Sequence, residues 1–138
     1  MAMFECNLNS NLVTLLWTNP KIKQSYGATE NLLFNAQTIT VSKEYKSYII
    51  ECDGYTGNMG DDSYRCINNI FVSKDGKYIL SGISNNESRN LVGVRQFNKS
   101  GLNFIFKNGY AVNNLNEKPA QSDVYAVPLR IYGCDISI

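Results

Sequence analysis

The sequence contains no histidine among its 138 residues. Histidine is the commonest general base, a frequent zinc ligand and a member of most catalytic triads. The four cysteines form no C-x-x-C pair, so a zinc site without histidine would need all four to converge. We therefore expect no metal ion, no cofactor and no catalytic residue, and we expect that the protein is not an enzyme.

The sequence also lacks clustered basic charge and long apolar runs. Its 13 basic residues balance 12 acidic ones and leave a net charge of +1, whereas a dedicated nucleic-acid binder normally carries a basic face. The longest apolar runs are too short to cross a membrane. The N-terminus has neither the basic region nor the apolar segment of a signal peptide. We expect no nucleic-acid partner, no membrane insertion and synthesis in the cytoplasm.

What the sequence does contain is a series of short β-rich runs separated by polar turns. With 43% apolar and 18% charged residues, the chain has the composition of one globular domain, which we place over residues 1–138. The runs alternate apolar and polar residues, as half-buried strands do. This pattern predicts an all-β fold, a single antiparallel β-sandwich of jelly-roll type. The expected strands are 12–17, 37–41, 45–51, 64–73, 77–81, 89–97, 102–107 and 124–133.

Turn residues suggest how these strands connect. The segment 74–76 (KDG) predicts a hairpin between 64–73 and 77–81, and 98–101 (NKSG) predicts a second hairpin of the four-residue type. Pro128 cannot donate a ladder hydrogen bond, so its strand should lie at an edge or contain a bulge. Long loops are expected at 18–35, 53–63 and 108–123, and binding sites commonly lie in such loops.

The loop 53–63 is the first candidate binding site. A tyrosine ring can stack on a sugar while carboxylates and amides bind its hydroxyl groups, and Gly54, Gly57 and Gly60 let the backbone approach a ligand. The loop 108–123 could supply a second wall. The candidate ligand-binding residues are Asp53, Tyr55, Asn58, Asp61, Asp62, Tyr110, Asn113 and Asn114.

Other interpretations of the same segment stay open. Its oxygen-rich side chains could wrap a calcium ion, although the EF-hand spacing is missing. Asp61 and Asp62 could form the carboxylate pair of a glycoside hydrolase, but neighbouring side chains usually point apart. Cys52 and Cys66 could form a disulfide if their strands face each other, which the sequence does not decide.

Five motifs follow one another in a fixed order, namely 15–20 (LLWTNP), 36–39 (AQTI), 45–51 (YKSYIIE), 95–97 (RQF) and 125–133 (YAVPLRIYG). The chain is similar, over residues 12–133, to small β-sandwich domains of tail-fibre and receptor-binding proteins from phages and prophages of Gram-positive and gut bacteria. The resemblance implies a virion component that touches the host surface, commonly as a homotrimer, beside other virion proteins.

We therefore expect a phage tail-associated structural or receptor-binding protein that recognises a cell-surface glycan of the host or docks on the tail tip. The alternatives are a head-fibre or capsid decoration protein and a stand-alone carbohydrate-binding module. Residues 134–138 (CDISI) extend past the terminal Tyr-Gly of the family pattern. Their alternation predicts an added edge strand, through which copies could pair.

Overall fold

The computed structural model describes residues 12–22, 32–57, 64–65, 67–86, 89–112, 121–122 and 124–136. Within these ranges the chain forms ten strands and no helix. The strands are β1 Val13–Thr18, β2 Gln37–Thr40, β3 Ser47–Tyr55, β4 Tyr64–Arg65, β5 Ile67–Val72, β6 Gly76–Asn86, β7 Arg89–Ser100, β8 Asn103–Ala111, β9 Gln121–Ser122 and β10 Tyr125–Cys134.

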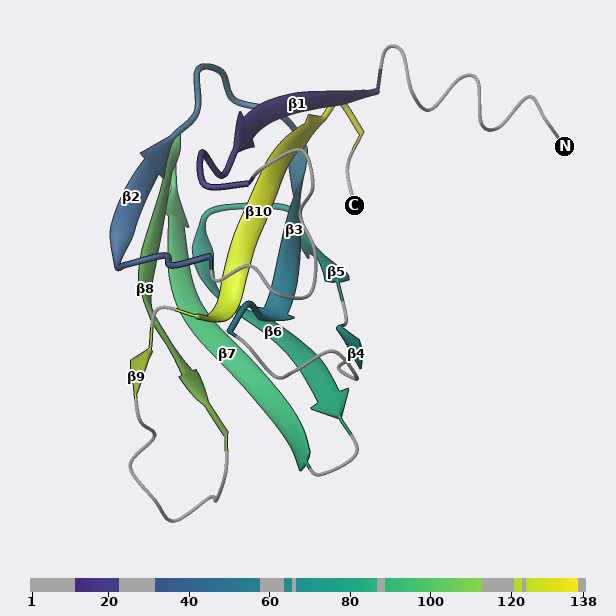
Figure 1. The fold of residues 1–138 in the computed structure, drawn as a ribbon. Helices are drawn as coiled ribbons and strands as arrows, with labels where there is room; N and C mark the ends of the chain where they lie inside the picture. The colour runs from purple at the N-terminus through teal and green to yellow at the C-terminus, as the bar shows by residue number, and fades with distance from the viewer. Residues whose placement is uncertain are drawn as a thin grey trace, which may run out of the picture.

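The strands form two antiparallel sheets that pack face to face (Figure 1). The four-stranded sheet has the order β1-β10-β3-β5. The six-stranded sheet has the order β2-β8-β7-β6-β4, with β9 paired to β8. The predicted all-β sandwich is therefore confirmed.

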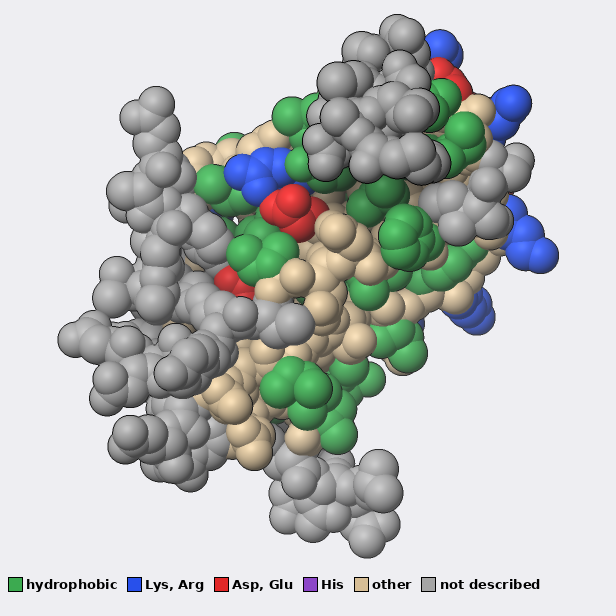
Figure 2. Space-filling model, turned by 90° about the vertical axis from the view of Figure 1, so that its right-hand side faces the viewer, with side chains coloured by type: hydrophobic (Ala, Val, Ile, Leu, Met, Phe, Trp, Pro, Cys, Tyr) green, Lys and Arg blue, Asp and Glu red, His purple; other side chains and the backbone are tan. Residues whose placement is uncertain are grey.

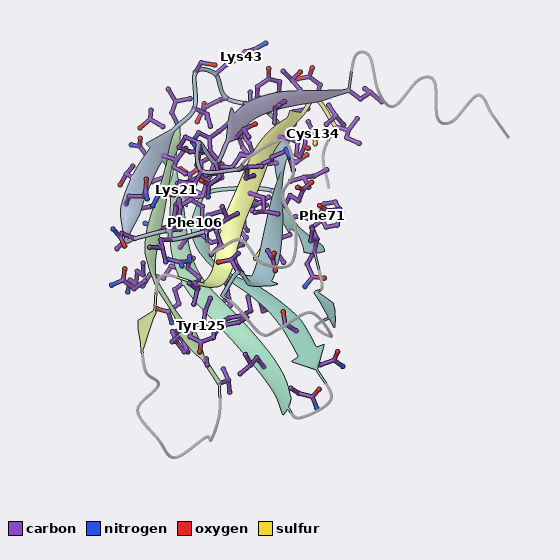
Figure 3. All side chains as sticks on the ribbon, viewed as in Figure 1. Lys21, Lys43, Phe71, Phe106, Tyr125 and Cys134 are labelled. Atoms are coloured by element: carbon purple, nitrogen blue, oxygen red, sulfur yellow. The ribbon has the colours of Figure 1, made fainter. Side chains whose placement is uncertain are left out.

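One hydrophobic core lies between the two sheets. Alternate residues of each strand point inward, so Ile50 and Ile131 from one sheet meet Leu80 and Phe104 from the other, and all four are fully buried. Phe106 also points into this layer (Figure 3). Burying a side chain of this size contributes roughly 1.5–3 kcal/mol, so the core is the main source of stability.

The predicted hairpin around residues 74–76 is wrong. β5 pairs with β3 in one sheet, whereas β6 pairs with β7 in the other, so the short connection between β5 and β6 crosses from sheet to sheet. Asp75 in this connection accepts hydrogen bonds from Lys99 Nζ and the Gly101 amide, which tie it to the β7–β8 turn. A turn-forming sequence therefore links two sheets here.

The second predicted hairpin exists but has a tighter turn. β7 and β8 stay paired up to Ser100 and Asn103, so the turn comprises only Gly101 and Leu102. Gly101 has φ +57°, in the left-handed region that glycine adopts without steric cost.

The last strand does not lie at an edge. β10 runs between β1 and β3, and its register with β3 shifts between Pro128 and Arg130, which confirms the predicted bulge at Pro128. Asn19, from the LLWTNP motif, is buried and donates its Nδ2 hydrogen bond to the Pro128 carbonyl oxygen at 3.1 Å. The motif thus stabilises the bulge.

The expected edge strand at the C-terminus is also wrong within the described residues. β10 ends at Cys134, and the chain then bends. The Asp135 amide donates to the Leu12 carbonyl, and the Ser47 hydroxyl donates to the Ile136 carbonyl. β1 and β3 flank β10 on its two sides, so the segment directly after β10 is not at an edge of this sheet. Ser137 and Ile138 lie outside the described residues.

Candidate functional site

Three of the sequence-predicted site residues lie in strands rather than in loops. Asp53 and Tyr55 belong to β3, and Tyr110 belongs to β8 in the other sheet. The expected loops at 53–63 and 108–123 are therefore shorter than predicted at their starts, because β3 and β8 continue into them. The other candidates, Asn58, Asp61, Asp62, Asn113 and Asn114, lie outside the described residues.

Asp53 and Tyr55 are held by the protein itself. Asp53 is fully buried, and its carboxylate accepts a hydrogen bond from the Tyr55 amide at 3.1 Å. The half-buried Tyr55 ring packs against Tyr125 with 5.2 Å between centroids. A Cβ atom on Gly57 would lie 2.2 Å from the Tyr55 hydroxyl oxygen, so the backbone covers that side of the ring. These contacts give Tyr55 a packing role.

A hollow on the outer face of the six-stranded sheet offers a site that the sequence analysis did not identify. Its volume is about 830 Å³, within the roughly 300–1,000 Å³ that ligand pockets usually have. Three adjacent strands, β6, β7 and β8, supply its walls. The lining residues are Lys77, Tyr78, Ile79, Gln96, Phe97, Asn98, Ile105 and Lys107.

Strand register places the outward side chains of this hollow side by side. Lys77 pairs with Asn98, and Asn98 pairs with Ile105, so one row crosses all three strands. Ile79 pairs with Gln96 in the next row. Because side chains two residues apart share a face, Lys107 projects on the same side as Ile105. The site is therefore built on strands, which hold side chains more rigidly than loops.

A β-bulge lies at the centre of the hollow. Between the pairs Arg95–Gly109 and Phe97–Phe106, β8 has one residue more than β7, so Lys107 and Asn108 of the bulged β8 together face Gln96. Directly below, the fully buried Arg95 donates from Nε to the Ala126 carbonyl at 2.9 Å. Its Nη1 donates to the Lys107 carbonyl at 2.7 Å and its Nη2 to the Tyr125 carbonyl at 2.9 Å. Arg95 thus fixes the backbone beneath the site.

The chemistry of the hollow favours an anionic, partly apolar ligand. Lys77 and Lys107 are exposed and bring two positive charges, and none of the eight described lining residues carries a carboxylate. Gln96 and Asn98 offer amide donors and acceptors. Ile79 and Ile105 are 52% and 41% exposed and provide an apolar surface. Hydroxyl groups, C–H faces and acidic groups occur together in charged glycans.

Three ionisable groups elsewhere have shifted pKa values. Burial raises the pKa of the Cys134 thiol, which disfavours its nucleophilic thiolate form. Burial also raises the pKa of Tyr132, with a further contribution from the Glu51 charge. The hydrogen bond from Lys99 lowers the pKa of Asp75, assisted by the Gly101 amide. None of these three residues lines the hollow.

Other kinds of site find no support in the part of the chain that the structure describes. No three His, Cys, Asp or Glu side chains in it gather where they could hold a metal ion. Most of the calcium-loop candidates lie outside this part, as does Cys66, whose pairing with the buried Cys52 stays a prediction. The described segments include no helix long and apolar enough to cross a membrane.

Comparison with known proteins gives no match, whether with family models, curated proteins or solved structures. Function must therefore be inferred from the residues and their geometry.

The sequence did carry one signal for the hollow. In each of its three strands, side chains that point into the core alternate with side chains that point outward. The outward positions hold lysines, amides and isoleucines in place of the usual short polar residues. Finding the site from this signal would have required the register between strands, which the sequence leaves open.

Proposed function

We propose that this chain is a phage tail-associated attachment protein that binds a negatively charged cell-surface glycan of the host. The ligand would lie in the hollow on the six-stranded sheet. Two lines of support combine here, namely the ordered motifs that resemble receptor-binding tail domains and the chemistry of the hollow. The observation that carries the proposal is the pair Lys77 and Lys107 in a hollow whose described lining has no acidic residue.

Each part of the lining has a role in this proposal. The lysine ammonium groups attract phosphate or carboxylate groups of the glycan as point charges. The amides of Gln96 and Asn98 bind hydroxyl groups, and Ile79 and Ile105 contact the C–H faces of the sugar rings. In this proposal the site retains the glycan and does not cleave it.

Assembly follows from the same resemblance. We propose that the protein works in the virion as a homo-oligomer in contact with other virion proteins, which would present several hollows to one cell surface. Multiple weak sites on one particle raise the overall affinity without any new contact, because later binding events become intramolecular. The modest affinity of a single open hollow is then sufficient for attachment.

Two experiments test the proposal. Fluorescently labelled protein should bind host cells, and purified acidic wall glycan should compete while a neutral glycan of similar length should not. Cells stripped of their acidic glycan that still bind as before would contradict the proposal. Gold-labelled antibody against the chain should mark phage tails. Label on capsids would favour the decoration-protein alternative instead.

A further inference from the structure

Four apolar side chains form one row across the outer face of the four-stranded sheet. Leu15 pairs with Tyr132, Tyr132 pairs with Ile49, and Ile49 pairs with Phe71. Directly paired residues project to the same face, so the row runs from β1 at one edge to β5 at the other. Leu15 is 52% and Phe71 55% exposed. Figure 3 shows Phe71 projecting outward from β5.

A polar row lies next to this apolar row, two residues further along β10, β3 and β5 and three along β1, where the register shifts. Thr18 pairs with Arg130, Arg130 with Glu51, and Glu51 with Asn69. Arg130 Nη1 donates a 2.5 Å hydrogen bond to Glu51 Oε1, and both side chains are partly exposed, by 34% and 21%. In Figure 2 one basic and one acidic side chain lie in contact, with hydrophobic side chains near them. The two described rows thus combine four apolar side chains with one charge of each sign.

We propose that a second copy of this chain covers this face. A two-fold axis parallel to the strands, midway between β10 and β3, places the two sheets face to face and preserves the rows. Under that operation Tyr132 lies over Ile49 of the second copy, and Leu15 lies over Phe71 of the second copy. Large residues from the edges of one sheet therefore meet large residues from the edges of the other, in an isologous interface.

Charge complementarity supports the second copy as the occupant. β10 and β3 exchange positions across the axis, so Arg130 of each copy faces Glu51 of the other. The two intramolecular pairs then join into a network of four alternating charges. A partner without this symmetry would have to match both charges separately, whereas a second copy matches them automatically.

The size of the face sets the strength of the association. Four strands about 4.8 Å apart and about six residues long cover roughly 400 Å² per copy, or about 800 Å² in total. Stable interfaces bury about 1,200–2,000 Å², so we expect a weak, reversible dimer. The hollow lies on the opposite sheet and stays open in both copies. The inference therefore does not rest on the proposed glycan binding.

Analytical ultracentrifugation of the full chain at concentrations from about 10 µM to about 1 mM tests the interface, because it measures the mass of the associated species. A monomer–dimer equilibrium is expected, and Phe71→Ser should raise its dissociation constant by about tenfold or more, as loss of an aromatic anchor does. The matched control is Ile83→Ser, because Ile83 is equally exposed at 55% but lies on the six-stranded sheet. A monomer throughout, a trimer, or equal effects of the two changes would overturn the proposal.

A charge exchange tests the two-fold geometry specifically. Arg130→Glu leaves two negative charges on the face, and Glu51→Arg leaves two positive ones, so each variant alone should stay monomeric. Their equimolar mixture should form a heterodimer, because every charge then faces its opposite. Thermal melts check that both variants fold, and if either does not, the Phe71 and Ile83 comparison decides. Folded variants that fail to associate on mixing would overturn the proposed axis.

Discussion

The buried guanidinium of Arg95 donates a 2.7 Å hydrogen bond to the carbonyl oxygen of Lys107, whose own side chain lines the hollow on the opposite surface of the sheet. One side chain in the core therefore fixes the backbone of the binding surface. Two further carbonyls, of Ala126 and Tyr125, accept from the same group and connect β7 to the other sheet.

Replacing Arg95 with Lys should destabilise the protein and weaken its binding together. An ammonium group cannot reproduce the planar fork that reaches three carbonyls, so buried acceptors lose their donors. We expect the free energy of unfolding in urea to fall by about 2–4 kcal/mol. The matched control is Gln96→Ala, which removes an exposed lining side chain and should change stability by less than about 0.5 kcal/mol. Equal stability of the two variants would contradict the role assigned to Arg95.

Tyr55→Ala should lower stability, because the ring packs on Tyr125 and against the backbone at Gly57. Loss of a half-buried aromatic side chain should cost about 1–3 kcal/mol, measured by thermal or urea denaturation. Host-cell binding per folded molecule should stay unchanged. If binding falls while the melting temperature does not move, the tyrosine is a ligand contact as the sequence first indicated.

Glycines at one end of the sandwich let the two sheets meet backbone to backbone. A Cβ atom on Gly93 would lie 2.1 Å from the Gly54 carbonyl oxygen. Gly93→Ala should therefore cost about 3 kcal/mol or more, since β3 and β7 would have to separate. At Gly101 no atom lies within 4 Å of the added carbon, so Gly101→Ala should cost only the left-handed backbone, about 1 kcal/mol. Urea denaturation that ranks the two in reverse order would contradict this close approach.

The Asp75 carboxylate should make a contribution to the free energy of unfolding that is lost in acid. Its pKa is lowered from 3.8 in the folded protein by Lys99 and the Gly101 amide, so the unfolded chain binds the proton more tightly. This stability is present above pH 3.8 and is lost as the pH falls through the lower folded-state value. The Asp75→Asn variant should thus have a lower melting temperature than the native protein at pH 7. This difference in melting temperature should shrink below pH 3.8. A difference that does not depend on pH would exclude the carboxylate as its source.

Local patterns predicted the strands well, because each segment by itself shows the alternation of apolar and polar residues that a half-buried strand has. β1, β2, β7 and β8 lie close to their expected positions, and the bulge at Pro128 follows from its missing amide hydrogen. Pairing was harder to predict. The turn-like segment at 74–76 is compatible with a hairpin and also with a connection from one sheet to the other. Only the three-dimensional contacts of Asp75 with Lys99 and Gly101 distinguish the two.

The candidate site depended on the same missing information. Tyr55 looked like a loop residue because Asp53 and Gly54 favour turns, yet β3 continues through them. The hollow needs three strands in register, a bulge in β8 at Lys107 and Asn108, and an arginine beneath it. These are long-range relationships, which no single segment of the sequence specifies.

Calorimetric titration with purified acidic glycan measures how much the two lysines of the hollow contribute to binding. Lys77→Gln combined with Lys107→Gln should weaken binding by about tenfold or more, equivalent to about 1.4 kcal/mol. Raising the ionic strength from about 0.05 M to about 0.5 M should weaken binding by the native protein and affect the double variant less. The control with equal charge is Lys43→Gln combined with Lys46→Gln, on the exposed β2–β3 connection, which should bind as the native protein does. Equal loss in both double variants, or unchanged binding without Lys77 and Lys107, would exclude the hollow as the glycan-binding site.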